Sequence, residues 1–276
     1  MSMGKKRILY IAPEIYPYLP ESYLANICRF LPQGIQEREN EIRTFMPKFG
    51  CINERKNQLH EVIRLSGQNI IVNNFDHPLI IKVASLQVVR MQIYFIDSDD
   101  FFRRKHIFYD EKGDFFADND ERMIFFAKGV IETVRKLGWN PDIVHCHGWM
   151  SSLVPIFIKT CYKDNPLFQD TRIVYSIYDD QFTQMLDANF AKKLEGTGID
   201  ASFIKHLRTP NYESLMQTAV DFSDAVVVAQ DHINSKILSY LDNYPRTVFT
   251  HPQSDSYVDE YDVFYDNLVE KEPITF

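Results

Sequence analysis

Short apolar runs alternate with helical patterns along most of the 276-residue chain, and this alternation restricts the fold more than any other sequence feature. Runs bounded by Pro, Gly or polar residues are typical of strands buried on both faces. Strands that alternate with helices pair in parallel, because each helix returns the chain to the same edge of the sheet. We therefore predict an α/β fold: a single Rossmann-like, doubly wound, mostly parallel sheet. The predicted parallel strands are Arg7–Ala12, Glu41–Met46, Met91–Ile96, Asp142–His145, Arg172–Ile177 and Ala225–Val228.

Apolar residues three and four positions apart predict the intervening helices. Ser22 is the expected N-cap of a helix over Ser22–Arg38, and Pro32 is expected to kink that helix or end it early. Asp118 is the expected N-cap of a helix over Asp118–Lys136, with Gly138 just past its end. Further helices are predicted over Met150–Lys159, Tyr212–Asp221 and Gln230–Tyr240, and short helices and loops over Tyr178–Pro210.

Two regions depart from the alternation. Three short candidate strands, separated by Gly67 and the His77-Pro78 pair, predict a small antiparallel β insertion. The strands are Leu59–Leu65, Asn69–Asn74 and Leu79–Val83, and the mixed segment Asp97–Asp118 is expected to be a long surface loop. From Asn243 the sequence is polar and rich in tyrosine. We therefore predict one domain over residues 5–242 and a loosely attached tail over 243–276, with room for one terminal helix.

Charge and composition exclude several classes of function. The chain carries 30 Lys and Arg against 38 Asp and Glu, a net charge of −8, whereas nucleic acids and anionic membranes bind basic surfaces. No apolar run approaches the roughly 18 residues that span a bilayer, and no signal-peptide pattern follows Met1–Lys6. We expect a cytoplasmic protein that binds neither nucleic acid nor membrane.

The sequence contains none of the common motifs for nucleotide, metal or acyl-transfer chemistry. The first predicted strand-to-helix turn, Pro13–Ser22, lacks glycine, which excludes a dinucleotide site of the GxGxxG kind there. A GxSxG elbow, a P-loop and a CxxC pair are also absent. His145 and His147 would point to one side of a strand and Cys146 to the other, so we expect no zinc site. We predict no catalytic residues, no metal and no cofactor.

Five segments of the chain form a pattern together: ILYIAPEIYPY at Ile8–Tyr18, MPKFG at Met46–Gly50, DNDERMIFFAKG at Asp118–Gly129, LGWNPDIVHCHGW at Leu137–Trp149 and DFSDAVVVAQ at Asp221–Gln230. In order and spacing they resemble the N-terminal half of bacterial glycogen synthases and plant starch synthases, the family-5 glycosyltransferases. The resemblance implies the N-terminal domain of a GT-B enzyme, which moves glucose from ADP-glucose onto an α-1,4-glucan. It also implies that the chain has half the family's length and lacks the donor domain.

The loop after the first strand departs from the family pattern. The family carries Lys-Thr-Gly-Gly-Leu there, where the glycines let a helix N-terminus approach the ADP phosphates and the lysine adds positive charge. The aligned residues here are Pro20, Glu21, Ser22, Tyr23 and Leu24. The lysine is lost, a glutamate would repel phosphate, and a tyrosine would fill the space. We predict a degenerate donor loop that binds no pyrophosphate.

Three further segments of the family's site are altered. The family reads His-x-His-Asp-Trp-His in its histidine strand, and its last histidine is an active-site residue. Here both the aspartate and that histidine are missing, because the segment is His145-Cys146-His147-Gly148-Trp149-Met150. The family's Thr-Ile-His-Asn and Asn-x-x-Lys patterns are replaced by Ser176-Ile177-Tyr178-Asp179 and Ser214-Leu215-Met216-Gln217. Joint loss of these pieces argues against an ordinary active enzyme.

Several residues remain where the family has cleft residues, and they suggest a residual glucan-binding surface: Glu14, Tyr16, Asp118, Asn119, Arg122, His147 and Trp149. Aromatic faces and carboxylates commonly pair with carbohydrate, since rings stack on C–H groups and carboxylates accept from hydroxyls. The alternative is purely structural, with Asp118 as an N-cap, Arg122 as its helix partner, Glu14 as a loop anchor and His147 and Trp149 as packing. We expect His145 to be buried and hydrogen-bonded at a strand end.

The resemblance favours a glycogen synthase-like protein of α-glucan metabolism in the bacterial cytoplasm. We expect no activity from the chain alone, and a role as a glucan-binding or regulatory partner of an active enzyme. Its expected partners are an α-glucan, such as glycogen or a malto-oligosaccharide, and an active glycosyltransferase chain or a second copy. One alternative is an active glucosyltransferase completed by a second chain. The other is a non-catalytic protein-interaction or dimerisation module.

Overall fold

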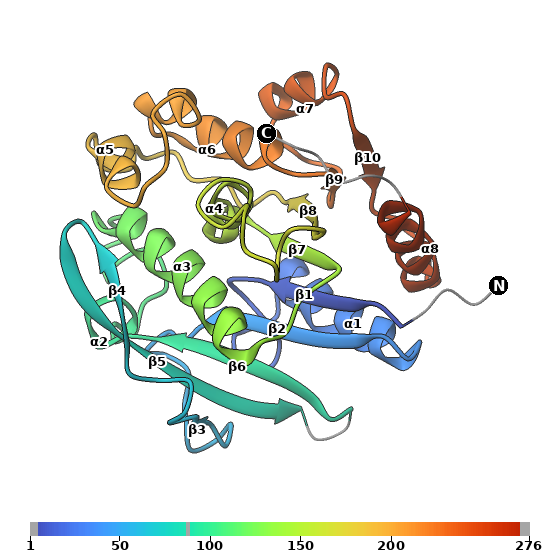
Figure 1. Ribbon diagram of the computed structural model, residues 1–276, viewed down its shortest axis with the longest axis horizontal. Coiled ribbons are helices and arrows are strands. Elements are labelled where there is room, and N and C mark those ends of the chain that lie inside the picture. Colours follow the sequence, from blue (N-terminus) through green and yellow to red (C-terminus); the bar gives the residue numbers. More distant parts are fainter. Residues whose placement is uncertain (1–4, 87–88, 271–276) are drawn as a thin grey trace.

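The computed structural model describes residues 5–86 and 89–270, and one large sheet forms its centre (Figure 1). The strands of this part of the chain are β1 (Arg7–Ile11), β2 (Glu41–Pro47), β3 (His60–Glu61), β4 (Gln68–Val72), β5 (Phe75–Leu86), β6 (Met91–Asp97), β7 (Ile143–His147), β8 (Arg172–Ile177), β9 (Ala225–Val228) and β10 (Thr247–Thr250). They lie in the order β10-β9-β8-β7-β1-β2-β6-β5-β3, and β4 pairs with β5 outside that path. The strands from β10 to β6 run parallel.

The strand order reverses at β1, which makes the sheet doubly wound. The chain runs from β1 outward to β2 and β6, then crosses to the other side of β1 and adds β7 to β10 in turn. Because crossovers between parallel strands are right-handed, the helices of the two halves cover opposite faces. The predicted α/β fold with a mostly parallel sheet is confirmed.

Helices cover both faces of the sheet. They are α1 (Tyr23–Glu37), α2 (Asp99–Phe102), α3 (Asn119–Leu137), α4 (Leu153–Lys159), α5 (Phe190–Glu195), α6 (Tyr212–Asp221), α7 (Ser235–Leu241) and α8 (Tyr257–Val269), with 3-10 turns at Trp149–Ser151 and Lys205–Arg208. In the row on one face, α3 contacts α4, α4 contacts α6, and α6 contacts α7, whereas α1 contacts α8 on the other face (Figure 1). In the described part of the chain, no helix combines the length and apolar character needed to cross a membrane.

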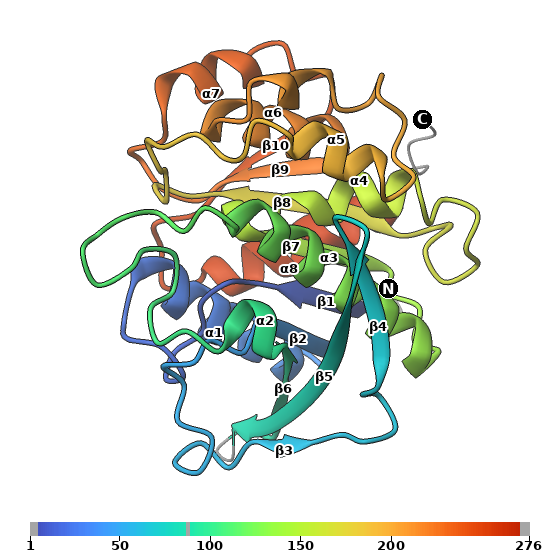
Figure 2. The ribbon, with the colours of Figure 1, turned by 90° about the vertical axis from the view of Figure 1, so that its left-hand side faces the viewer.

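The predicted antiparallel insertion is present and is larger than expected. β5 spans 12 residues and pairs antiparallel with both β4 and β6, so the insertion extends the main sheet. Asn73 and Asn74 form the turn between β4 and β5 with φ angles of +50° and +66°, which asparagine tolerates better than most residues. The tip of this hairpin reaches past α3 toward α5 (Figure 2).

The predictions for the helix ends are confirmed at Ser22 and Gly138, whereas the structure differs from them at Asp118 and at Pro32. Ser22 Oγ accepts the backbone N–H of Ala25 at 2.9 Å, and Gly138 ends α3 with φ +60°. Asp118 stands at the N-cap position of α3 but makes no capping hydrogen bond, because its carboxylate pairs with Arg104 at 2.6 Å. Pro32 does not end α1, which continues to Glu37 with the proline ring buried against the core.

The predicted surface loop between β6 and α3 is anchored in the core instead. α2 lies within it, and Phe101 and Phe102 are buried. The guanidinium of Arg122, on α3, donates to the carbonyl oxygens of Phe101 at 3.0 Å and of Ile107 at 2.6 Å. The sequence interpretation missed this anchoring because the charges of the segment obscured its buried phenylalanines.

The prediction of a loosely attached tail after residue 242 is wrong for residues 243–270, which pack onto the domain. β10 extends the sheet beside β9, and α8 buries an apolar stripe on the face that α1 also covers. The buried side chains recur three or four residues apart: Tyr261, Phe264, Tyr265 and Leu268. Tyrosine and acidic residues gave the segment a polar composition, although its tyrosines supply the buried face. Residues 271–276 lie outside the described residues.

The hydroxyl group of Tyr265 joins α8 to two strands. It lies 2.7 Å from Nδ1 of His145 on β7 and accepts at 3.1 Å from the hydroxyl of Tyr10 on β1. Nε2 of His145 in turn lies 2.7 Å from the hydroxyl of Ser176 on β8. All four side chains are buried, so this network replaces hydrogen bonds to water that the groups lose on folding.

We expect Tyr265→Phe to lower the free energy of unfolding by about 1–3 kcal/mol, because it leaves a nitrogen of His145 buried without a partner. Urea denaturation followed by circular dichroism measures the change. Tyr257→Phe is the matched control on the same helix, and its loss should stay below about 0.5 kcal/mol. Equal effects of the two substitutions would contradict the bridging role of Tyr265.

An ion-pair cluster ties α5 to the N-terminus of α3. The ammonium of Lys193 lies 2.7 Å from Asp120 Oδ2, 2.8 Å from Glu121 Oε1 and 3.2 Å from Asp187 Oδ2. Asp120 is fully buried, and burial raises the pKa of its carboxyl group. The ammonium group therefore compensates a carboxylate that has no access to water.

We expect Lys193→Met to destabilise the protein by about 3 kcal/mol, because an uncompensated buried carboxylate is costly. The adjacent Lys192 is exposed, so Lys192→Met should change the free energy of unfolding by less than about 0.5 kcal/mol. Urea denaturation at neutral pH compares the two. If Lys193→Met were as mild as Lys192→Met, the cluster would contribute nothing to stability.

Candidate functional site

The carboxyl ends of β1, β7 and β8 form the first candidate site. Doubly wound sheets bind ligands where the strand order reverses, because the loops leave a crevice there. In this chain the reversal lies at β1. The segments that meet at the crevice follow these three strands: Pro13–Ser22, Gly148–Ser152 and Tyr178–Asp180.

The N-terminus of α1 is closed by side chains of its own loop. Ser22 Oγ accepts the N–H of Ala25 and donates to Glu14 Oε2 at 2.7 Å. The ring of Tyr23 packs edge-to-face against Tyr178, with 6.4 Å between centroids. A helix N-terminus attracts anions through its free N–H groups and its positive pole. Here a carboxylate already stands next to the capping group, so a phosphate would meet a negative charge.

Gly148 and Asp180 fit together at the ends of β7 and β8. Gly148 has φ +69°, and a Cβ at this position would lie 2.7 Å from Asp180 Oδ2. The Asp180 carboxylate uses the free space to accept the N–H of Trp149 at 2.8 Å and the hydroxyl of Tyr212 at 2.9 Å. Burial raises the pKa of Asp180 to about 6. Sequence reasoning noted the change at Gly148 but missed Asp180, which follows the aligned segment by one residue.

The two histidines of β7 lie on one side of the strand, as expected. Their ring centroids are 4.0 Å apart, and Nδ1 of His147 lies 2.8 Å from the hydroxyl of Tyr178. Burial lowers the pKa of both imidazoles, to about 3 for His147, so both are neutral near pH 7. The buried, hydrogen-bonded environment predicted for His145 is present. Among the described residues, no three His, Cys, Asp or Glu side chains gather closely enough to hold a metal ion.

The structure divides the predicted glucan-binding residues between two places. Glu14, Tyr16 and His147 lie at the ends of β1 and β7, and the side chains of Glu14 and Tyr16 are partly exposed. The others surround the loop before α3: Asp118 pairs with Arg104, Asn119 donates to the carbonyl of Phe108, and Arg122 holds the loop. Trp149 is 4% exposed and packs against Phe108, Phe115 and Phe182. The packing role that the structural alternative gives Trp149 is present, whereas Asp118 makes no capping bond and Arg122 bonds the loop and Asn119 instead of Asp118.

The loop that the sequence analysis interprets as a degenerate donor loop lies between β1 and α1. Pro20 and Glu21 are exposed, Ser22 is the N-cap of α1, and Tyr23 is its first residue. The aromatic ring at 23 also lies 6.0 Å from the ring of His251, near the end of β10. The loop therefore contacts the C-terminal segment, a neighbour that sequence reasoning did not anticipate.

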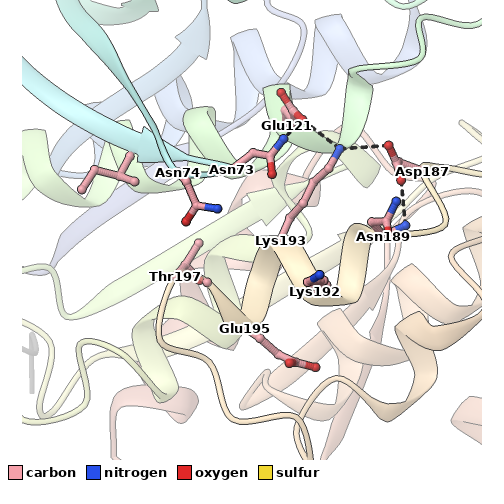
Figure 3. A pocket seen from close by; sticks show the side chains of 11 residues that line it. Asn73, Asn74, Glu121, Asp187, Asn189, Lys192, Lys193, Glu195 and Thr197 are labelled. Carbon is pink, nitrogen blue, oxygen red and sulfur yellow. Dashed lines mark hydrogen bonds and ion pairs between the residues drawn. The ribbon is translucent and has the colours of Figure 1, made fainter.

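A second candidate site is a pocket of about 650 Å³ between the β4–β5 turn, the N-terminus of α3 and α5 (Figure 3). Its polar lining comes from three distant segments: Asn73, Asn74, Glu121, Asp187, Asn189, Lys192, Lys193, Glu195 and Thr197. Figure 3 shows Lys193 between Glu121 and Asp187, which it bridges through ion pairs. No sequence motif joins these segments, so sequence reasoning could not find the pocket.

Known proteins share both the sequence and the fold. Residues 7–244 match the family described as the starch synthase catalytic domain. A glycogen synthase from Chlorobium luteolum is 38% identical over 180 residues, which are 65% of this chain and 37% of that protein. One from Pelodictyon phaeoclathratiforme is 32% identical over 247 residues, covering 87% of this chain and 50% of that protein. The chain thus spans half or less of the length of these relatives.

A solved structure has the same fold. The catalytic domain of starch synthase IV from Arabidopsis thaliana, bound to ADP and acarbose, superposes with a TM-score of 0.72. The match covers 92% of this chain and 53% of that one at 18% sequence identity. Sheet order, sequence identity and the family match over most of the chain agree. The chain therefore belongs to the glycogen and starch synthase family, whose catalytic domain it matches over residues 7–244.

Proposed function

We propose that the chain acts in α-glucan metabolism as a glucan-binding or regulatory partner of an active glucosyltransferase, without transferring glucose itself. The observation that carries this proposal is the closed N-terminus of α1. The family resemblance implies that the ADP phosphates bind at this helix end. In this chain Ser22 and Glu14 occupy it, and the loop has Pro20 and Glu21 where the family has a lysine and a threonine.

The strand ends of β7 and β8 support the same proposal. His147 is buried, neutral and engaged with Tyr178, so it is not placed to donate a proton to a ligand. The position of the family aspartate is Gly148, and the carboxylate of Asp180 fills the space above it with bonds to Trp149 and Tyr212. The Asp180 carboxylate is held by two donors and Nδ1 of His147 by Tyr178, which suits a structural role for these groups.

The glucan part of the proposal rests on the family. The relatives are named glycogen synthases, and the Arabidopsis structure holds acarbose beside ADP. A partner of such an enzyme needs affinity for the glucan but no donor site. Two separate surfaces compete for this role: the strand ends, where Glu14 and Tyr16 are partly exposed, and the polar pocket beside α5.

We expect calorimetric titration to give saturable binding of maltoheptaose and no heat with ADP or ADP-glucose. The reason is that the α1 N-terminus is already occupied by the Ser22 cap and the Glu14 carboxylate. Transfer of radiolabelled glucose from ADP-glucose to glycogen should stay at the background rate.

An active bacterial glycogen synthase in the same assays is the positive control. Glucose incorporation by the purified chain would refute the absence of activity. Incorporation that requires a co-purifying protein would favour an enzyme completed by a second chain. Absence of glucan binding together with a stable dimer would favour the interaction-module alternative.

The tight fit at Gly148 gives a test of the closed strand end. We expect Gly148→Ala to cost more than the roughly 1–3 kcal/mol of backbone strain at φ +69° and ψ 168°, a conformation nearly restricted to glycine, because the new Cβ would also meet Asp180. Gly113→Ala is the matched control, since Gly113 has φ +84° and open space around it.

A double-mutant cycle with Asp180→Ala separates strain from contact. The combined loss should be smaller than the sum of the two single losses by about 1 kcal/mol or more, as measured by urea denaturation. If Gly148→Ala and Gly113→Ala cost the same, and the cycle is additive, Asp180 does not occupy the space above residue 148.

A further inference from the structure

We infer that the pocket between the β4–β5 turn, the N-terminus of α3 and α5 binds a short stretch of neutral saccharide chain. This inference rests on the proposed function and locates its glucan away from the strand ends. The pocket's volume of about 650 Å³ lies within the range of small-molecule sites, roughly 300–1,000 Å³.

The charges in the pocket favour an uncharged ligand. The lining carries three carboxylates and two ammonium groups. The carboxylates belong to Glu121, Asp187 and Glu195, and the ammonium groups to Lys192 and Lys193. Lys193 is bound to Glu121 and Asp187, as well as to buried Asp120, so its charge is already compensated. A free anion would meet these carboxylates, and a free cation would compete with Lys193. Neither an anionic nor a cationic ligand therefore gains much electrostatic free energy by binding in this pocket.

The polar groups suit a ligand with many hydroxyls. Amides of Asn74 and Asn189 carry both donors and acceptors, and Lys192 donates. The hydroxyl of Thr197 donates to the carbonyl of Leu194 at 2.6 Å and is left to accept from a ligand. A sugar hydroxyl also donates and accepts, so it can satisfy each of these groups in turn. Ile71 adds an apolar side chain that is 52% exposed, on which the C–H groups of a sugar ring can pack.

The walls of the pocket are fixed before any ligand binds. Asn73 Nδ2 donates to Glu121 Oε1 at 3.1 Å, which attaches the hairpin turn to α3. Lys128 Nζ donates to the carbonyl of Ile71 at 3.1 Å and holds the same hairpin lower down. Lys193 attaches α5 to α3 through Asp120. Because these contacts set the width of the pocket, a ligand loses little free energy in ordering it.

The test measures maltoheptaose affinity of the full chain by calorimetry. Asn74→Gly and Lys192→Met remove a pocket amide and a pocket ammonium, and glycine accepts the positive φ of residue 74. We expect the double variant to bind at least tenfold more weakly than the unmodified chain. Gln58→Gly with Lys56→Met is the matched control, because Gln58 also has a positive φ and both side chains are exposed. The control should bind like the unmodified chain.

A second pair of variants addresses the strand ends. Tyr16→Ala and Glu14→Gln remove the competing glucan surface at the strand ends, so a glucan held in the pocket keeps its affinity within about twofold when they are introduced. If instead they abolish binding while the pocket variant retains it, the pocket assignment is overturned and the proposed function stands. If the unmodified chain binds neither maltoheptaose nor glycogen, the proposed function fails and the pocket assignment fails with it. A melting temperature within a few degrees of the unmodified chain shows that each variant is folded.

Discussion

The phenolic hydroxyl of Tyr265 connects α8 to buried polar groups on three strands, β1, β7 and β8. It contacts His145 and Tyr10, and His145 reaches Ser176 on the next strand. Most buried polar atoms have a hydrogen-bond partner, and α8 supplies the partner of Nδ1 of His145. The same helix approaches α1 so closely that a side chain at Gly34 would clash with Val258. The sheet face at the ends of β1 and β7 is therefore filled by the protein itself.

Much of the fold could be predicted because its elements carry local signals. The bounds of β8, α6 and β9 match the prediction residue for residue, since short apolar runs and a regular helical stripe define them. Where the sequence interpretation failed, tertiary packing outweighed local preference. The core contacts of Pro32 offset its lost hydrogen bond, and the charged loop before α3 is held by Arg122. The tyrosines of α8 read as polar although their rings lie in the core.

Of the candidate site, only the departures from the family pattern could be predicted from the sequence. Alignment to a family pattern identifies Pro20, Glu21 and Tyr23 as departures, because such a comparison needs no coordinates. It could not reveal Asp180, whose importance arises from the space left at Gly148. Nor could it reveal the pocket beside α5, since the β4–β5 turn, α3 and α5 are brought together only by folding. The comparison with the family pattern therefore identified the positions that differ from it. It could not identify the contacts that the residues of this chain make at those positions.

The fit between Gly148 and Asp180 also bears on evolutionary reversibility. A return of the family aspartate at 148 would place its Cβ 2.7 Å from an oxygen of Asp180, with a second carboxylate beside the first. A loss of Asp180 alone would leave the N–H of Trp149 and the hydroxyl of Tyr212 without their acceptor. Substitution at either position alone therefore lowers stability. The two positions are coupled, and a larger side chain at 148 is tolerated only together with a change at 180.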